Sequence, residues 1–307
     1  MHEPLTLIYQ DDHLLAVHKP AGLLVHRTAL DAHAGDDLVT RLRAQTGAPV
    51  WPAHRLDKGT SGVLLLARDA ATARLLGEAF AAASQGEARR IDERIDKRID
   101  KHIHKHIHKR YLALVRGWPA AAGEIDQPLA RDPELPSTGQ PQLPACTRWR
   151  VLQRLLLPLA TDELHADTRL ALVEVQPLTG RRHQIRRHFK ALAHPLIGDA
   201  THGKGPLNRA LAAHIGHGRL WLHALQLSLP HPVTGLPLVL RAEPEAGWHT
   251  WHTWHTWDTW GIQGTGVPVT PGAPQPPEAP TTAGAFNSNK PTTTARGRLT
   301  GWSDRLV

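Results

Sequence analysis

The chain has 307 residues, a formal net charge of +8 and a single cysteine, Cys146. The length allows one large domain or two small ones with a hydrophobic core, and the charge favours a polyanionic partner such as nucleic acid or an anionic membrane. A single cysteine excludes an intramolecular disulfide and a thiolate metal cluster, and no apolar run is long enough to span a bilayer. Residues 1–4 lack the basic-then-apolar pattern of a signal peptide, so we expect a cytoplasmic protein without a membrane partner.

Short strands and a few helices are predicted along the first 242 residues. Helical spacing is found at residues 37–42, and Asp69 is well placed to cap an Ala-rich helix that follows it. Strand-like runs occur at residues 5–9, 14–17, 63–67, 111–115, 147–153, 170–175 and 220–229. Many strands with few helices indicate an α+β domain built on a mixed, largely antiparallel sheet.

Three segments depart from this pattern, so we expect a folded domain over residues 1–245 with a low-complexity insert at 89–110. The insert is a tetrapeptide repeat that could form a charged helical arm. A Trp-His-Thr repeat follows at 246–260; its tryptophans could stack on bases, but no basic residue lies among them. The Pro- and Thr-rich tail at 261–307 has the composition of a disordered segment.

The histidines of the insert raise the question of a metal site. They stand at alternate positions, at His102, His104, His106 and His108. No neighbouring set of carboxylates or thiolates completes a ligand group, so we expect no metal ion. A metal-storage role for these histidines and the Trp-His-Thr run remains an alternative.

A polar turn at residues 53–62 leads directly into the apolar run 63–67. Asp57 therefore lies at the edge of a hydrophobic core, where a charge is costly unless it is paired. The residues that follow it, Lys-Gly-Thr-Ser-Gly, are also good turn formers. Taken alone, this stretch favours a turn role for Asp57 over a catalytic one.

A second cluster, residues 174–190, runs from a strand through a turn into a basic helix. Five of the twelve residues 179–190 are Lys or Arg, and none is acidic. The spacing predicts Arg182 and Arg186 on one face of the helix, with Ile185 and Phe189 in an apolar stripe that anchors it. This composition fits a phosphate-contacting surface, and equally a solvated charged face.

Three motifs in this order resemble the pseudouridine synthases, a family that includes ribosomal large-subunit and tRNA enzymes. They are His-Arg-Leu-Asp-x-x-Thr-Ser-Gly at 54–62, Lys-x-Tyr-x-Ala-x-Val-x-Gly at 109–117, and Leu-Thr-Gly-Arg-x-His-Gln-Ile-Arg-x-His at 178–188. The resemblance covers about residues 5–240. It implies the pseudouridine synthase fold, an α+β fold whose active-site cleft crosses the central sheet, with the catalytic domain in residues 1–245.

The resemblance also implies roles for individual residues. The catalytic aspartate of the family corresponds to Asp57, and the arginine that pairs with it corresponds to Arg186. The tyrosine that contacts the target base, and is a candidate for the proton transfer, corresponds to Tyr111. The residues expected to bind the substrate are His54, Arg55, Thr60, Arg182, His183, Arg187 and Lys190. The reaction requires no cofactor.

Further stretches, among them 18–27, 194–199 and 231–235, are similar to the family members that modify uridine 65 at the base of the tRNA T arm. The expected function is therefore isomerisation of that uridine, with Asp57 as nucleophile, by a monomer that needs no protein partner. Within the family, a uridine of 23S rRNA or another tRNA position is the alternative. In another class, the alternative is a non-catalytic RNA-binding factor on the same scaffold.

Overall fold

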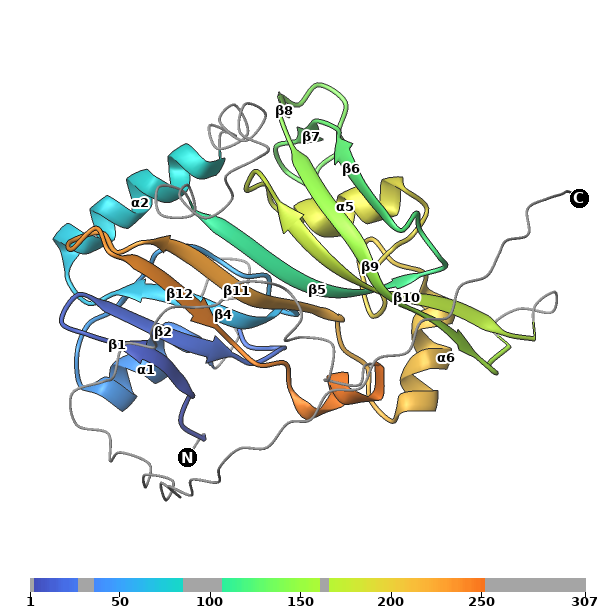
Figure 1. Ribbon diagram of the computed structural model, residues 1–307, viewed down its shortest axis with the longest axis horizontal. Helices are drawn as coiled ribbons and strands as arrows, with labels where there is room; N and C mark the ends of the chain where they lie inside the picture. The colour runs from blue at the N-terminus through green and yellow to red at the C-terminus, as the bar shows by residue number, and fades with distance from the viewer. Residues whose placement is uncertain (1–2, 27–35, 85–106, 161–165, 252–307) are drawn as a thin grey trace, which may run out of the picture. The chain divides into compact units, whose positions relative to one another are not determined.

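Ten strands form one mixed sheet in the computed structural model, which describes residues 3–26, 36–84, 107–160 and 166–251 (Figure 1). The strands of this sheet are β1 (Leu7–Gln10), β2 (Leu14–Lys19), β3 (Trp51–Pro52), β4 (Ser61–Ala67), β5 (His108–Arg116), β6 (Ala122–Asp126), β9 (Cys146–Leu157), β10 (Thr168–Pro177), β11 (Leu222–Pro230) and β12 (Pro237–Arg241). A small second sheet pairs β7 (Leu129–Ala130) with β8 (Gln142–Leu143). The helices are α1 (Leu38–Thr46), α2 (Ala70–Ser84), α5 (Gln184–Ala191), α6 (Gly205–Ile215) and the 3-10 helix η2 (Ala246–Trp251).

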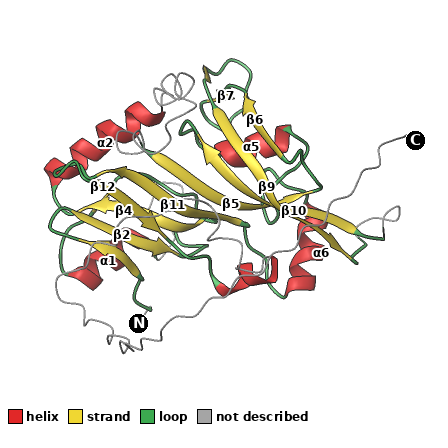
Figure 2. Cartoon of the chain, in the orientation of Figure 1, coloured by secondary structure: helices red, strands yellow, loops and turns green. Residues whose placement is uncertain are grey.

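The main sheet runs in the order β1-β2-β4-β11-β5-β10-β9-β6, with β3 beside β4 and β12 beside β11 (Figure 2). Every pairing is antiparallel except that of β4 with β11. The predicted α+β class with a mixed, largely antiparallel sheet is therefore confirmed. The chain returns to the centre of the sheet with β11, so His223 pairs with Ser61, 162 residues earlier in the sequence.

The centre of the sheet is buried on both faces, and this explains the uninterrupted apolar run at 63–67. Alternate side chains of a strand point to opposite faces of the sheet. Leu64 and Leu66 therefore pack against α1 residues such as Leu38 on one face, whereas Val63 and Leu65 pack against α2 on the other. Farther along the sheet, α5 and α6 bury opposite sides of β5 and β10. Each of these helices contributes its own hydrophobic cluster to the core.

One glycine makes the parallel pairing of β4 and β11 possible. Gly62, paired with Ala224, has φ +111°, a left-handed value that suits glycine. A methyl group at Gly62 would overlap the carbonyl oxygen of Ala224. The glycine at the end of the Asp57 motif therefore lets the two strands approach closely, immediately beside the turn that carries Asp57.

The basic helix differs from its sequence-based prediction at the N-terminal end. It begins at Gln184, because His183 has a left-handed φ of 55° and ends the preceding turn. The Gln184 side chain holds this turn by accepting hydrogen bonds from the Arg181 N–H at 3.0 Å and the Thr179 hydroxyl at 2.7 Å. The placement of Arg182 on the helix was wrong: it lies in the turn, whereas Arg186 is helical as predicted.

The first tryptophan of the Trp-His-Thr run belongs to the core. Trp248 is 2% exposed, and its ring meets that of Trp221 edge-on at a centroid distance of 5.1 Å. The rest of the run beyond residue 251, the tail, and residues 89–106 of the insert lie outside the described residues. None of the helices in the described ranges is both long and apolar enough to cross a bilayer.

Candidate active site

Asp57 lies in the loop between β3 and β4, at the mouth of a cleft. The Thr60 N–H donates to the Asp57 carbonyl oxygen at 3.0 Å and so closes a tight turn. Behind it, the Lys58 carbonyl accepts hydrogen bonds from the Gly22 N–H at 2.8 Å and from Lys19 Nζ at 3.1 Å. This backbone is fixed from behind, and the Asp57 side chain, 26% exposed, faces the cleft.

Arg186 is the cation that pairs with Asp57, as the resemblance implies. Its NH1 nitrogen donates to Asp57 Oδ2 at 2.9 Å. Asp199 binds the rest of the guanidinium, since Nε and NH2 donate to its two carboxylate oxygens at 2.7 and 2.8 Å. Burial alone would lower the pKa of Arg186, but the hydrogen bonds and charges of Asp199 and Asp57 raise it above its usual value.

Asp199 is the buried anchor of this arrangement. Its side chain is fully buried, and its Oδ1 also accepts hydrogen bonds from the Thr201 and His202 N–H groups, each at 2.9 Å. Burial would raise the pKa of Asp199, but Arg186 and the His202 N–H outweigh it and hold the pKa below its usual value. Two carboxylates therefore share one guanidinium; both border the cleft, but only the Asp57 side chain is appreciably exposed, at 26%.

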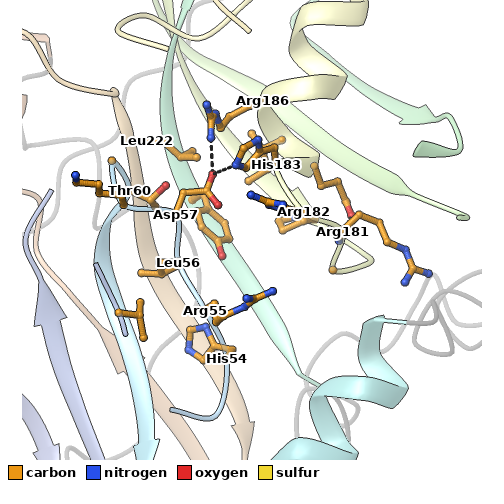
Figure 3. Close-up of a pocket in the computed structure, with 18 of the residues that line it drawn as sticks. His54, Arg55, Leu56, Asp57, Thr60, Arg181, Arg182, His183, Arg186 and Leu222 are labelled. Carbon is orange, nitrogen blue, oxygen red and sulfur yellow. Dashed lines mark hydrogen bonds and ion pairs between the residues drawn. The ribbon is translucent and has the colours of Figure 1, made fainter. Parts of the chain in front are cut away.

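Two histidines stand beside this ion pair. His183 Nε2 lies 3.8 Å from Asp57 Oδ2, and His183 Nδ1 shares a hydrogen bond of 3.1 Å with His202 Nε2. Figure 3 shows His183 and Arg186 converging on the same oxygen of Asp57. Burial lowers the pKa of His183 and lowers that of His202 to about 4, so both rings are neutral near pH 7.

Tyr111, on β5, lines the cleft with Asp57. Burial and then the negative charge of Asp57 raise the pKa of its phenol above the usual range. Tyr111 therefore keeps its proton at neutral pH and can donate a hydrogen bond or pack against a flat ring. Neither property makes it a base in the free protein.

The cleft has a volume of about 1130 Å³ and contains charged and aromatic side chains. It is large enough for a nucleotide, whose binding sites fall at or below this size. Among the predicted residues, those that line it are His54, Arg55, Asp57, Thr60, Tyr111, Arg182, His183 and Arg186. Arg187 and Lys190 are not among its lining residues.

The structure gives the predicted substrate-binding residues unequal freedom. Arg55 is exposed at the cleft, and no described residue binds its guanidinium (Figure 3). His54 stacks on Phe80 at 4.9 Å and accepts a hydrogen bond from the Leu65 N–H at 3.2 Å. Burial, followed by the charge of Lys109, lowers the pKa of His54 to about 3, so its ring is a neutral support for the turn. Thr60, also predicted to bind the substrate, is only 2% exposed, so little of its surface is free to contact a ligand.

The basic residues around α5 are likewise not equivalent. Arg182 forms ion pairs with Asp132, at 3.2 Å, and with Glu134. Arg187 donates to the Ala130 carbonyl at 2.8 Å. Lys190 is exposed, with no ion pair among the described residues. Of these three, Lys190 is the cation most available to a phosphate.

Two residues of the site, Asp199 and Lys19, were not predicted from the sequence to belong to it. Asp199 stands in the run His-Pro-Leu-Ile-Gly-Asp, and its paired carboxylate has no local signal. Lys19 is fully buried, and its Nζ donates to the carbonyls of Pro20, Leu23 and Lys58. A lysine at the end of an apolar strand, before Pro-Ala-Gly, is the signal that could have drawn attention to it.

The described residues contain no group of three or more His, Cys, Asp or Glu arranged to hold a metal ion. His102, His104 and His106 lie outside the described ranges. Around Asp57 the cations are supplied by arginine and lysine side chains. One ion-paired carboxylate in a basic, nucleotide-sized cleft across a mixed sheet is typical of an enzyme that acts on nucleic acid.

The match to a known family defines this enzyme more closely. Residues 13–191 match the model of the family described as RNA pseudouridylate synthase. The chain belongs to this family of isomerases. It is 39% identical over 249 residues to tRNA pseudouridine synthase C of Vibrio cholerae, covering 80% of this chain and 93% of that protein. It is also 39% identical over 250 residues to tRNA pseudouridine synthase C of Yersinia pestis, covering 80% of this chain and 88% of the relative.

Solved structures agree with the fold. Human RNA Pseudouridylate Synthase Domain Containing 1 superposes with a TM-score of 0.54 at 26% identity, covering 79% of this chain and 84% of that one. Human RNA Pseudouridylate Synthase Domain Containing 4 gives a TM-score of 0.53 at 25% identity, with coverages of 80% and 92%. The expected pseudouridine synthase fold is confirmed.

Proposed function

We propose that this protein converts a uridine of tRNA to pseudouridine, at position 65 in the T-arm stem, with Asp57 as the catalytic nucleophile. The observation that carries the proposal is the 2.9 Å ion pair of Asp57 with Arg186 at a cleft that Tyr111 also lines. The names of the relatives support tRNA as the substrate. The similarity of stretches such as 194–199 to enzymes acting on uridine 65 supports the position.

The reaction breaks the N1–C1′ bond of uridine, turns the detached uracil and joins C1′ to C5. One proton leaves C5 and one is bound at N1, so the composition and the oxidation state do not change. Asp57 acts at the sugar, either by attack on C1′ or by promoting a glycal route. Arg186 fixes the orientation of the Asp57 carboxylate through the 2.9 Å ion pair.

Tyr111 would hold the uracil while it is detached. Because the phenol keeps its proton, its part is to contact the ring and donate a hydrogen bond rather than to remove the C5 proton. His183, neutral and 3.8 Å from Asp57, is placed to contact the nucleotide at the same point. The cleft thus combines a reactive carboxylate with groups that retain the leaving base.

A uridine in a stem must leave the helix before it can reach Asp57. Extruding a paired base costs a few kcal/mol. Arg55, exposed beside Asp57, can occupy the space that the base vacates or steady the flipped nucleotide. Lys190 and Arg187 would contact phosphates on the adjoining α5 surface, with Lys190 the freer of the two.

The experiment that tests this proposal is pseudouridine mapping of tRNA and rRNA from cells with and without the gene. We expect one modification at tRNA position 65 to disappear with the gene and to return on expression of the protein. A transcript with cytidine at position 65 should remain unmodified by the purified protein. Loss of a site in 23S rRNA, or at another tRNA position, would contradict the proposed target.

A further inference from the structure

A lysine inside the cleft carries a charge that the mechanism above does not use. Lys109 lies two residues before Tyr111 on β5, so both side chains leave the strand on the same face. Both line the cleft. Lys109 Nζ donates one hydrogen bond, to the Thr179 carbonyl oxygen at 3.2 Å. No carboxylate in the described parts of the chain pairs with it.

The surroundings of Lys109 are unfavourable to its charge. Burial lowers its pKa to about 8, and no acid in the described ranges offsets that effect. An ammonium group has three N–H donors, and the Thr179 carbonyl accepts from one of them. With respect to the described residues, Lys109 therefore retains free donors and an unpaired positive charge inside a cleft that receives RNA, and an anionic ligand would satisfy both.

A glycine beside Lys109 lets Ser84 approach the same turn closely. A methyl group at Gly180 would lie 3.7 Å from Lys109 Nζ and 2.5 Å from the hydroxyl oxygen of Ser84, the last residue of α2. The ammonium and the hydroxyl thus lie on either side of Gly180, and all three residues line the cleft. A hydroxyl and an ammonium facing one cleft are the donor types that phosphate oxygens accept in protein–RNA contacts.

We propose that Lys109, Ser84 and Gly180 form a subsite for one phosphodiester group of the bound RNA, next to the nucleotide held at Asp57. The proposal rests on the proposed function, because it requires RNA in the cleft. A phosphate fixed at this point sets the register of the strand, so that one particular nucleotide of the flipped segment reaches Asp57. The subsite lies on β5, α2 and the turn before α5, and it is separate from the exposed cations of α5.

Binding of a tRNA transcript as a function of salt tests this proposal. The Asp57→Asn background prevents conversion during the measurement. We expect Lys109→Met to lower the affinity about tenfold and to reduce the slope of log K against log salt by about one. Lys109→Arg should restore the slope. The control Lys204→Met removes the same charge at an exposed position outside the cleft and should change the affinity less than twofold.

A second measurement changes the RNA instead of the protein. It uses a series of T-arm RNAs, each with one phosphate replaced by a neutral methylphosphonate. One such replacement should weaken binding to the protein that retains Lys109 but not to Lys109→Met. If Lys109→Met keeps the full salt slope, or if every linkage affects both proteins equally, the subsite is wrong. If the subsite fails these tests but the wild-type protein modifies tRNA, the proposed function stands. If the wild-type protein neither binds nor modifies tRNA, both proposals are wrong.

Discussion

Arg186 is bound more extensively by Asp199 than by Asp57. Asp199 accepts hydrogen bonds from Nε and NH2 at 2.7 and 2.8 Å, whereas Asp57 accepts one from NH1 at 2.9 Å. The Asp199 side chain is fully buried, whereas that of Asp57 is 26% exposed. The guanidinium is therefore oriented from inside the protein, and Asp57 meets a cation that is already fixed.

This relationship predicts that Asp199 acts in catalysis as a positioning residue, through Arg186. We expect Asp199→Asn to lower kcat about 100-fold by releasing the guanidinium, with little change in KM. It should also lower the free energy of unfolding by roughly 3 kcal/mol, because a buried ion pair loses one partner. Steady-state kinetics and chemical denaturation measure the two effects.

Glu124→Gln is the matched control for Asp199→Asn. It breaks the pair of Glu124 with Arg148, which is 2.6 Å long but about one-third exposed. An ion pair screened by solvent contributes less than about 1 kcal/mol to the free energy of unfolding. Glu124→Gln should therefore leave both stability and activity nearly unchanged. An Asp199→Asn protein with wild-type kcat would show that Asp57 and its loop alone suffice to orient Arg186.

Lys19 makes stability depend on pH in a defined window. Burial is the main cause that lowers its pKa from 10.5 to about 7, partly opposed by the charge of Asp57. Between these values the unfolded chain binds a proton that the folded protein has released, so the contribution of Lys19 to stability rises with pH. We expect the difference in unfolding free energy between the wild type and Lys19→Met to grow from pH 7 to pH 10. Parallel curves for the two proteins would contradict this assignment.

Trp248 joins the start of the Trp-His-Thr run to the core. It packs on Trp221, and the guanidinium of Arg219 lies 5.4 and 5.9 Å from the two rings. We expect Trp248→Ala to destabilise the protein by about 3–5 kcal/mol. Trp118, which is 38% exposed, provides the control, and Trp118→Ala should cost less than about 1 kcal/mol. Thermal unfolding distinguishes the two, and equal losses would place Trp248 outside the core.

Two basic residues near α5 should respond differently to neutralisation. Lys190 is exposed without an ion pair among described residues, whereas Arg182 is paired with Asp132 and Glu134. Lys190→Gln should therefore reduce the salt dependence of tRNA binding by about one unit of slope. Arg182→Gln should reduce it by clearly less, because its charge is already matched. The reverse order would mean that the carboxylates leave Arg182 when RNA binds.

The sequence predicted the paired residues of the site better than the residues that hold them in place. Asp57 and Arg186 are 129 residues apart, and it was the resemblance of their motifs to the pseudouridine synthases that implied the pair. The strand at 63–67 and the helix capped by Asp69 were predictable because a short apolar run after a turn and a helix cap are local signals. These elements and the mixed sheet agree with the structure.

The remaining features depend on contacts that have no local signal. The partners of Arg182 come from a loop at residues 131–134 without periodicity, so its neutralisation could not be predicted. The helix start moved to Gln184 because a side chain closes the turn and one residue, His183, adopts a left-handed conformation. Lys109 has no carboxylate partner among the described residues, and its place in a cleft built by β5, α2 and the turn before α5 is known only from the tertiary structure.

We predict that Asp57 performs the isomerisation and is dispensable for RNA binding. The most direct measurement compares the wild type with Asp57→Asn, assaying pseudouridine formation and tRNA affinity on the same transcript. We expect conversion to fall by at least about 10³-fold, equivalent to ~4 kcal/mol of barrier, while the affinity changes less than about threefold. Conversion at the wild-type rate by Asp57→Asn, or a parallel loss of binding, would contradict the account.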